Sequence, residues 1–120
     1  MSPYYTFVTL FFLCFILCID AKVCVNVYGR GGCWFFEMAK KLGDALKSNS
    51  AFQVNIQEFN YETWPKESQK LRETIPGGAG HRTSPFVYLG CDPSDTAFIG
   101  GYTEMAAYNF NALAEPRSDL

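Results

Sequence analysis

The feature that most constrains the fold is a strand pattern that runs into a helix pattern, with a cysteine at the junction. Residues 22–28 alternate and are rich in valine, which is typical of a strand. In residues 35–46 the apolar side chains recur at helical spacing. Cys33 lies between them, after a glycine-containing turn. Because the first turn of a helix has unpaired N–H groups, it favours a thiolate, which is a nucleophile.

The rest of the chain continues to alternate strand and helix patterns. We expect strands at residues 52–59, 86–89 and 97–99, a helix at residues 66–73, and a last helix at residues 105–113 capped by Thr103. This order predicts a parallel strand pair joined by a helix, followed by an antiparallel hairpin. The expected fold class is therefore α/β, with a mixed four-stranded sheet and helices on both faces.

The first 21 residues have the pattern of a secretory signal peptide. Residues 7–18 are apolar apart from Thr9, which suits a signal core and falls short of the roughly 20 residues that span a bilayer. Cleavage after Ala21 would leave one domain at residues 22–120 and no stable membrane association. An uncleaved signal anchor and a buried helix are the alternatives.

The charge of the chain excludes some classes of partner. The formal net charge is −2, and the sequence contains no basic run or stripe. We therefore expect no binding to nucleic acid or to an anionic membrane surface.

Three cysteines remain after the signal peptide is set aside: Cys24, Cys33 and Cys91. An odd number at irregular spacing does not indicate a disulfide framework, so at least one thiol should stay free. Cys24 is expected to be an inert core residue. Cys91 is expected to be an exposed loop residue, with a role as a resolving thiol as the alternative.

A metal site built from protein ligands is not expected. The sequence has no CxxC pair and no paired histidines, and its one histidine, His81, is predicted to lie in an exposed loop.

Three short motifs, in order, resemble those of a glutaredoxin. They are Cys33 at the first strand–helix junction, Thr83-Ser84-Pro85 before the third strand, and Gly100-Gly101 before the last helix. The resemblance covers roughly residues 23–113 and implies the thioredoxin fold.

The resemblance also implies a mechanism. Glutaredoxins use a nucleophilic cysteine in a CPYC or CxxS segment, which here reads CWFF. Cys33 is therefore the expected catalytic residue, and Phe36 takes the place of the second cysteine. An internal disulfide across this segment is impossible, so the resemblance is to the monothiol type.

A glutathione groove is implied in the same way. Pro85 is expected to be cis, and the Ser84 backbone to pair with the cysteinyl part of glutathione. A helix start at residues 101–103 would receive the γ-glutamyl carboxylate, with Tyr102 narrowing the site. Because glutathione has two carboxylates, cations and N–H donors at opposite ends of a groove would orient its sulfur. The expected binding residues are Arg30, Trp34, Phe35, Arg82, Thr83, Ser84, Pro85, Gly101, Tyr102 and Thr103.

The expected function is that of a glutathione-disulfide oxidoreductase that removes or transfers glutathione from mixed disulfides. Glutathione is its co-substrate, glutathionylated proteins are its partners, and the protein is expected to be a monomer. Two alternatives remain: a dimer that holds a [2Fe–2S] cluster through Cys33 of each chain and two glutathiones, and a non-catalytic glutathione-binding protein.

The end of the chain bears on localisation. Residues 117–120 read RSDL, a loose variant of the KDEL-type retention address. Together with the signal peptide, this pattern predicts the secretory pathway, either the lumen of the endoplasmic reticulum or the cell exterior.

Overall fold

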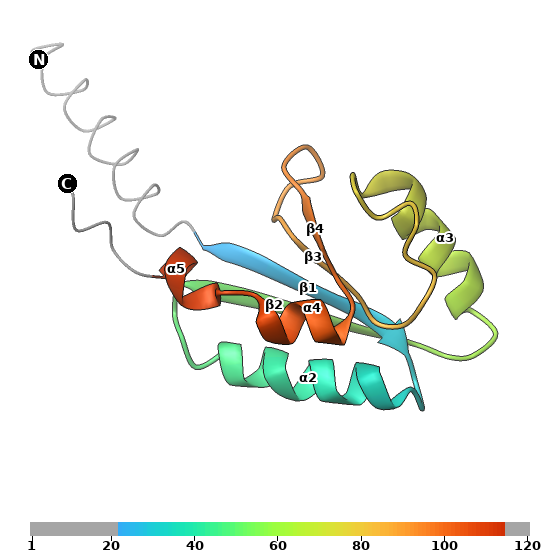
Figure 1. The fold of residues 1–120 in the computed structure, drawn as a ribbon, viewed down its shortest axis with the longest axis horizontal. Coiled ribbons are helices and arrows are strands. Elements are labelled where there is room, and N and C mark those ends of the chain that lie inside the picture. The colour runs from blue at the N-terminus through green and yellow to red at the C-terminus, as the bar shows by residue number, and fades with distance from the viewer. Residues whose placement is uncertain (1–21, 115–120) are drawn as a thin grey trace, which may run out of the picture.

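The strands form one mixed sheet in the order β2-β1-β3-β4 (Figure 1). The structure is a computed structural model that describes residues 22–114, so the predicted signal peptide and retention address lie outside the described residues. Strands β1 and β2 are parallel, whereas β3 is antiparallel to both β1 and β4, as predicted. The elements are β1 (Val23–Arg30), α2 (Trp34–Leu46), β2 (Phe52–Phe59), α3 (Trp64–Thr74), β3 (Phe86–Leu89), β4 (Ala97–Gly100), α4 (Tyr102–Ala107) and α5 (Phe110–Ala114).

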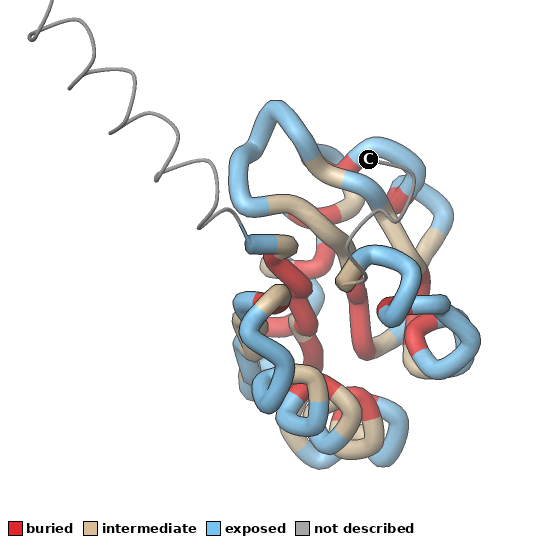
Figure 2. The backbone as a smooth tube through the Cα atoms, turned by 90° about the vertical axis from the view of Figure 1, so that its left-hand side faces the viewer, coloured by how far each residue is buried: buried red, intermediate tan, exposed pale blue. Residues whose placement is uncertain are grey.

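The helices cover both faces of this sheet, and one apolar cluster lies between the sheet and the helices on each face. Val25 and Val27 of β1 face one cluster, while Tyr28 faces the other, as the period of two in a strand requires. The first cluster is completed by α2, α4 and α5, and the second by α3. Figure 2 shows the buried residues concentrated along the strands and the inner sides of the helices.

The predicted single helix at the end of the domain is wrong, because the chain forms two short helices there. Helix α4 begins after Gly101 rather than at Thr103, and an extended residue, Tyr108, separates α4 from α5. Met105 and Phe110 are both buried in the first cluster. On one continuous helix these two side chains would point about 140° apart. The break therefore allows both of them to reach the core.

Cys24 is buried and Cys91 lies exposed in a loop, as predicted, but the two form a disulfide, which was not expected. The cause lies in the strand register. The Gly90 N–H donates to the Cys24 carbonyl over 2.9 Å, which places Cys91 next to Cys24. Among residues 22–114, Cys33 is then the one free cysteine. Cys91 is not available as a resolving thiol while this disulfide is intact.

Within residues 22–114, no helix combines the length and the apolar character needed to cross a bilayer.

Removal of the disulfide should destabilise the domain strongly. The bond joins residues 67 positions apart, and a loop of that length corresponds to about 4 kcal/mol through the entropy of the unfolded chain. We expect urea unfolding of the Cys24→Ser/Cys91→Ser variant to show a loss of that size. Dithiothreitol should destabilise the wild type and leave the variant unchanged. Equal stability of the two proteins without reductant would contradict this assignment.

Candidate active site

Cys33 is the N-cap residue of α2, as the sequence predicts. A tight turn leads from β1 to the helix, with Gly32 at a φ of 81°, a conformation that glycine adopts without strain. The Cys33 N–H donates to the Arg30 carbonyl over 3.3 Å, and the Cys33 carbonyl accepts from Glu37 N–H over 3.0 Å. The half-buried thiol therefore lies at the N-terminus of a 13-residue helix.

Phe36 belongs to the core and not to the surface of the site. Its side chain is fully buried, and its ring lies against Gly29 of β1 so closely that a Cβ atom at Gly29 would overlap it. By contrast, Trp34 and Phe35 are exposed. The position that holds a second cysteine in dithiol glutaredoxins is thus filled by a packed aromatic side chain.

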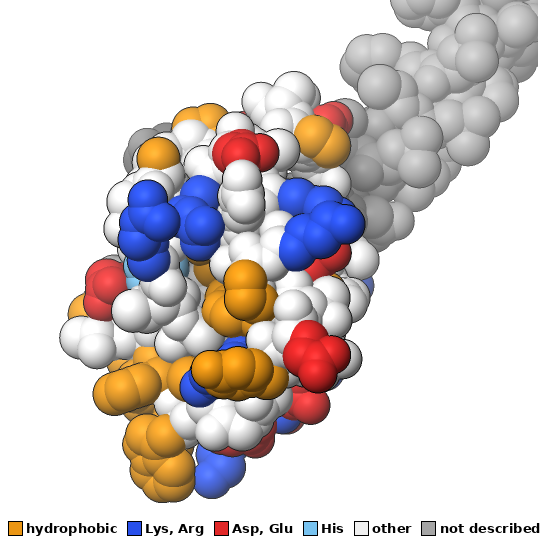
Figure 3. Space-filling view, turned by 90° about the vertical axis from the view of Figure 1, so that its right-hand side faces the viewer, with side chains coloured by type: hydrophobic (Ala, Val, Ile, Leu, Met, Phe, Trp, Pro, Cys, Tyr) orange, Lys and Arg blue, Asp and Glu red, His pale blue; other side chains and the backbone are white. Residues whose placement is uncertain are grey.

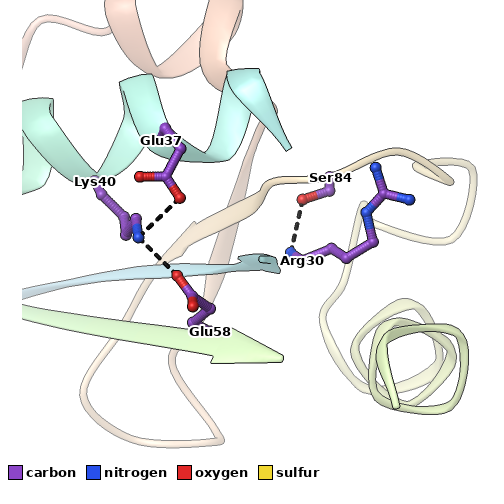
Figure 4. Close-up of polar contacts among 5 residues, drawn as sticks. All are labelled: Arg30, Glu37, Lys40, Glu58 and Ser84. Atoms are coloured by element: carbon purple, nitrogen blue, oxygen red, sulfur yellow. Dashed lines mark hydrogen bonds and ion pairs between the residues drawn. The ribbon is translucent and has the colours of Figure 1, made fainter. Parts of the chain in front are cut away.

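The segment before β3 lies beside the thiol. The Ser84–Pro85 peptide bond is cis, as the resemblance implies. Cys33 Sγ is 3.6 Å from the Ser84 carbonyl oxygen, and Ser84 Oγ accepts a 2.9 Å hydrogen bond from Arg30 N–H (Figure 4). In the part of the chain that the structure describes, the Ser84 N–H has no hydrogen-bond partner. The segment beside the thiol therefore has an unpaired backbone N–H, at Ser84.

An ion-pair network fixes α2 to the sheet behind the thiol. Lys40 Nζ is 2.6 Å from Glu58 Oε1 on β2 and 3.0 Å from Glu37 Oε1 on its own helix (Figure 4). Hydrogen bonds to Glu58 and Glu37 raise the pKa of Lys40 above its usual value, and the bond to Glu58 has the larger effect. Lys40 therefore stays protonated and offsets part of the negative charge of Glu37, which lies one turn from Cys33.

The start of α4 joins the site next to the cis proline. A Cβ atom placed at Gly101 would lie 3.6 Å from the Pro85 carbonyl oxygen, so the two segments touch. The Gly101 N–H donates to Glu104 Oε1 over 3.2 Å. This donor was expected to face a ligand carboxylate, but a carboxylate of the protein itself occupies it. Thr103 is exposed, whereas Tyr102 is half-buried and packs against the first apolar cluster.

His81 is not the exposed loop residue that the sequence analysis predicts. Its ring is half-buried, with centroids 5.6 Å from Phe86 and 5.3 Å from Phe98. Nε2 lies 2.8 Å from the Pro85 carbonyl oxygen, so this nitrogen carries the proton and donates it. His81 therefore stabilises the position of the cis-proline segment. The sequence carried no signal for this contact, because it depends on how the loop folds back.

Basic side chains line a cavity of about 400 Å³ between α3 and the loop before β3. It is bordered by Arg72 and Arg82, together with Gln69, Glu73 and Ala79. Arg82 and Thr83 are exposed, as a ligand-binding role requires. The sequence analysis missed Arg72, since no motif links a residue of α3 to the loop ten positions later. It also missed Tyr61, whose ring lies 5.1 Å from the Arg30 guanidinium carbon.

Residues 22–114 contain no group of three or more His, Cys, Asp or Glu side chains arranged to hold a metal ion.

The topology, the cysteine at the first helix N-terminus and the cis proline before β3 define a protein of the thioredoxin fold. Comparisons with known proteins agree. Glutaredoxin 1 from Francisella tularensis, solved in complex with cacodylate, superposes with a TM-score of 0.55 at 21% identity, covering 78% of this chain and 99% of that chain. Reduced Escherichia coli glutaredoxin superposes with a TM-score of 0.55 at 26% identity, covering 77% of this chain and 99% of that one. These likenesses show that the chain has the thioredoxin fold seen in glutaredoxins.

Sequence comparisons add no closer assignment, since no protein-family model matches the chain and no curated protein matches it significantly.

Proposed function

We propose that this protein is a glutathione-dependent thiol–disulfide oxidoreductase that uses Cys33 as its single nucleophile. The observation that carries the proposal is the pairing of the cysteines. Cys24 and Cys91 are joined to each other, which leaves Cys33 as the free thiol of residues 22–114, 3.6 Å from Ser84 O. The structural likeness to two glutaredoxins supports an oxidoreductase role.

The proposed reaction has two exchange steps. The Cys33 thiolate attacks the glutathione sulfur of a protein–glutathione disulfide. A bond forms between Cys33 and glutathione, and the protein sulfur leaves with the electron pair and takes a proton from water. The thiolate of a second glutathione then attacks the glutathione sulfur on Cys33. Oxidised glutathione leaves, and the Cys33 thiolate is restored. The protein–glutathione disulfide is thereby reduced to a protein thiol, one glutathione thiol is oxidised, and oxidised glutathione is the product.

The second thiol comes from glutathione because the protein offers none nearby. Phe36 is packed in the core, and Cys91 is held by Cys24. Both observations favour the monothiol route over a mechanism that closes a disulfide within the active-site segment.

The surroundings of Cys33 suit a tripeptide with a carboxylate at each end. The unpaired Ser84 N–H can pair with the cysteinyl backbone, and Arg72 and Arg82 offer two cations in the cavity between α3 and the loop that leads to Ser84. At the other end Glu104 holds the Gly101 N–H, so a γ-glutamyl carboxylate must displace this side chain before it binds there.

Replacement of the nucleophile should abolish activity. We expect the Cys33→Ser variant to release glutathione from a glutathionylated protein at least 100-fold more slowly than the wild type, measured by coupled formation of oxidised glutathione. The matched control is Cys24→Ser/Cys91→Ser, which keeps Cys33 and should stay active under conditions where it is folded.

Three results would redirect the proposal. Undiminished activity of Cys33→Ser would contradict it. Glutathione binding to the wild type without exchange would support the non-catalytic alternative, and visible absorption after anaerobic purification would support the cluster-bridged dimer.

Reversal of one charge in the basic cavity should weaken glutathione binding. A charge-assisted hydrogen bond contributes roughly 1.5–3 kcal/mol, so we expect Arg82→Glu to raise the KM for glutathione about tenfold, with a smaller change in kcat. The effect should shrink as salt is added. Lys66→Glu on the same helix as Arg72 makes an equal change in net charge outside this cavity and should leave KM unaltered. Equal effects of the two variants would argue against a role for Arg82.

The localisation proposal is the secretory pathway. A disulfide between Cys24 and Cys91 is typical of an oxidising compartment, which supports the signal pattern of residues 1–21. The full chain with a tag inserted ahead of Arg117 should be found in the endoplasmic reticulum or in the medium. A cytosolic protein would exclude this localisation.

A further inference from the structure

We propose that three exposed aromatic side chains around Cys33 form a docking surface for the protein half of the mixed disulfide, and that this surface selects an extended apolar segment. We call this surface, formed by Trp34, Phe35 and Tyr61, the aromatic rim. The inference rests on the proposed function and names the substrate class of the same site.

The rim concentrates apolar surface at one end of the molecule. Trp34 is 70% exposed, Phe35 55% and Tyr61 73%. Only two other large hydrophobic side chains are exposed in the described part of the chain, Tyr108 and Leu113, and they flank or belong to α5 at the opposite end of α4 from the site (Figure 1). Single exposed apolar residues need no explanation, but a group around a reactive thiol marks an interaction surface.

The residues of the rim come from two neighbouring segments of the chain, the start of α2 and the loop after β2. Trp34 and Phe35 follow Cys33 directly in α2. Tyr61 comes two residues after β2, and the last residue of β2, Phe59, is the register partner of Arg30. The Gly31 N–H donates to the Phe59 carbonyl over 2.8 Å, which ties the two connections together. Figure 3 shows hydrophobic side chains gathered on this end of the molecule, with Lys and Arg side chains beside them.

One member of the rim, Tyr61, is held in place before any partner arrives. The Arg30 guanidinium lies over the Tyr61 ring at 5.1 Å, a cation–π contact. The Arg30 backbone is fixed in turn, because its N–H donates to Ser84 Oγ and its carbonyl accepts a hydrogen bond from the Cys33 N–H. A ring that is already ordered loses less entropy when a partner packs on it, so the contact favours binding.

The geometry of thiol–disulfide exchange indicates which part of the substrate binds to the aromatic rim. In the first step glutathione lies in the groove along Ser84, and the protein sulfur leaves from the far side of the glutathione sulfur. Successive residues of an extended chain are about 3.3 Å apart, so those next to the reacting cysteine of the substrate must lie over the surface around Cys33 that glutathione leaves free. Tyr61, and the outer faces of Trp34 and Phe35, supply this surface. The nearby carboxylates Glu37 and Glu58 are both paired with Lys40, which offsets part of their charge and so weakens their opposition to apolar contact.

Two glutathionylated peptides with the same cysteine test this inference. One has aliphatic and aromatic residues on both sides of the cysteine, and the other has serine and glycine there. We expect the wild type to have a kcat/KM about tenfold higher for the apolar peptide. Tyr61→Ser and Phe35→Ser should each reduce this ratio to below about threefold. Leu113→Ser, a matched loss of an exposed apolar side chain outside the rim, should leave the ratio as in the wild type.

The outcomes separate the inference from the proposed function. A ratio near one in the wild type, or a ratio that the rim variants do not change, overturns the inference while the oxidoreductase function stands. Absence of turnover of both peptides overturns the proposed function, and the inference is then tested by binding of the apolar peptide with serine in place of cysteine. That peptide should bind the wild type at least fivefold more tightly than Tyr61→Ser, and equal affinity overturns the inference. A wild-type dimer that Tyr61→Ser converts to a monomer, with the ratio unchanged, would show that a second copy of the chain covers the rim.

Discussion

The hydrogen bond from Arg30 N–H to Ser84 Oγ joins the two segments on which the site depends. One segment is the turn from β1 into α2, which presents Cys33 at a helix N-terminus. The other is the cis-proline segment before β3, whose Ser84 carbonyl lies beside the thiol. The same interaction fixes Arg30, whose side chain supports Tyr61. A single backbone donor therefore connects the proposed nucleophile, the proposed glutathione groove and the proposed docking surface.

Two cysteines lie near opposite ends of strand β1, and they differ in their bonding. Near the start of β1, Cys24 forms a disulfide with Cys91, which links the sheet covalently to the loop between β3 and β4. Beyond its end, Cys33 stays free. The central position of β1, paired with β2 on one side and β3 on the other, keeps both ends fixed. The disulfide and the free thiol are thereby kept apart, so the exchange proposed for Cys33 need not involve the Cys24–Cys91 bond.

Local patterns of sequence were sufficient to predict the four strands, the first two helices and the position of Cys33 at the start of α2. The valine alternation of β1 and the apolar stripe of α2 depend only on neighbours along the chain, and Cys33 lies between them. The disulfide required the register of β1 against β3, which puts Cys91 beside Cys24, and periodicity does not contain that information. The break after α4, the inward turn of His81 and the meeting of Arg72 with Arg82 likewise follow from packing between distant segments. Binding residues in such contacts are recognised only once the fold is known.

The central claim is that one thiol, Cys33, carries the glutathione during turnover. The most direct measurement is the mass of the intact protein after reaction with oxidised glutathione, followed by peptide mapping without reduction. The account predicts one glutathione per chain, attached to Cys33, together with an intact peptide pair linked through Cys24 and Cys91. Glutathione found on Cys24 or Cys91, or a protein that takes up none, would contradict it.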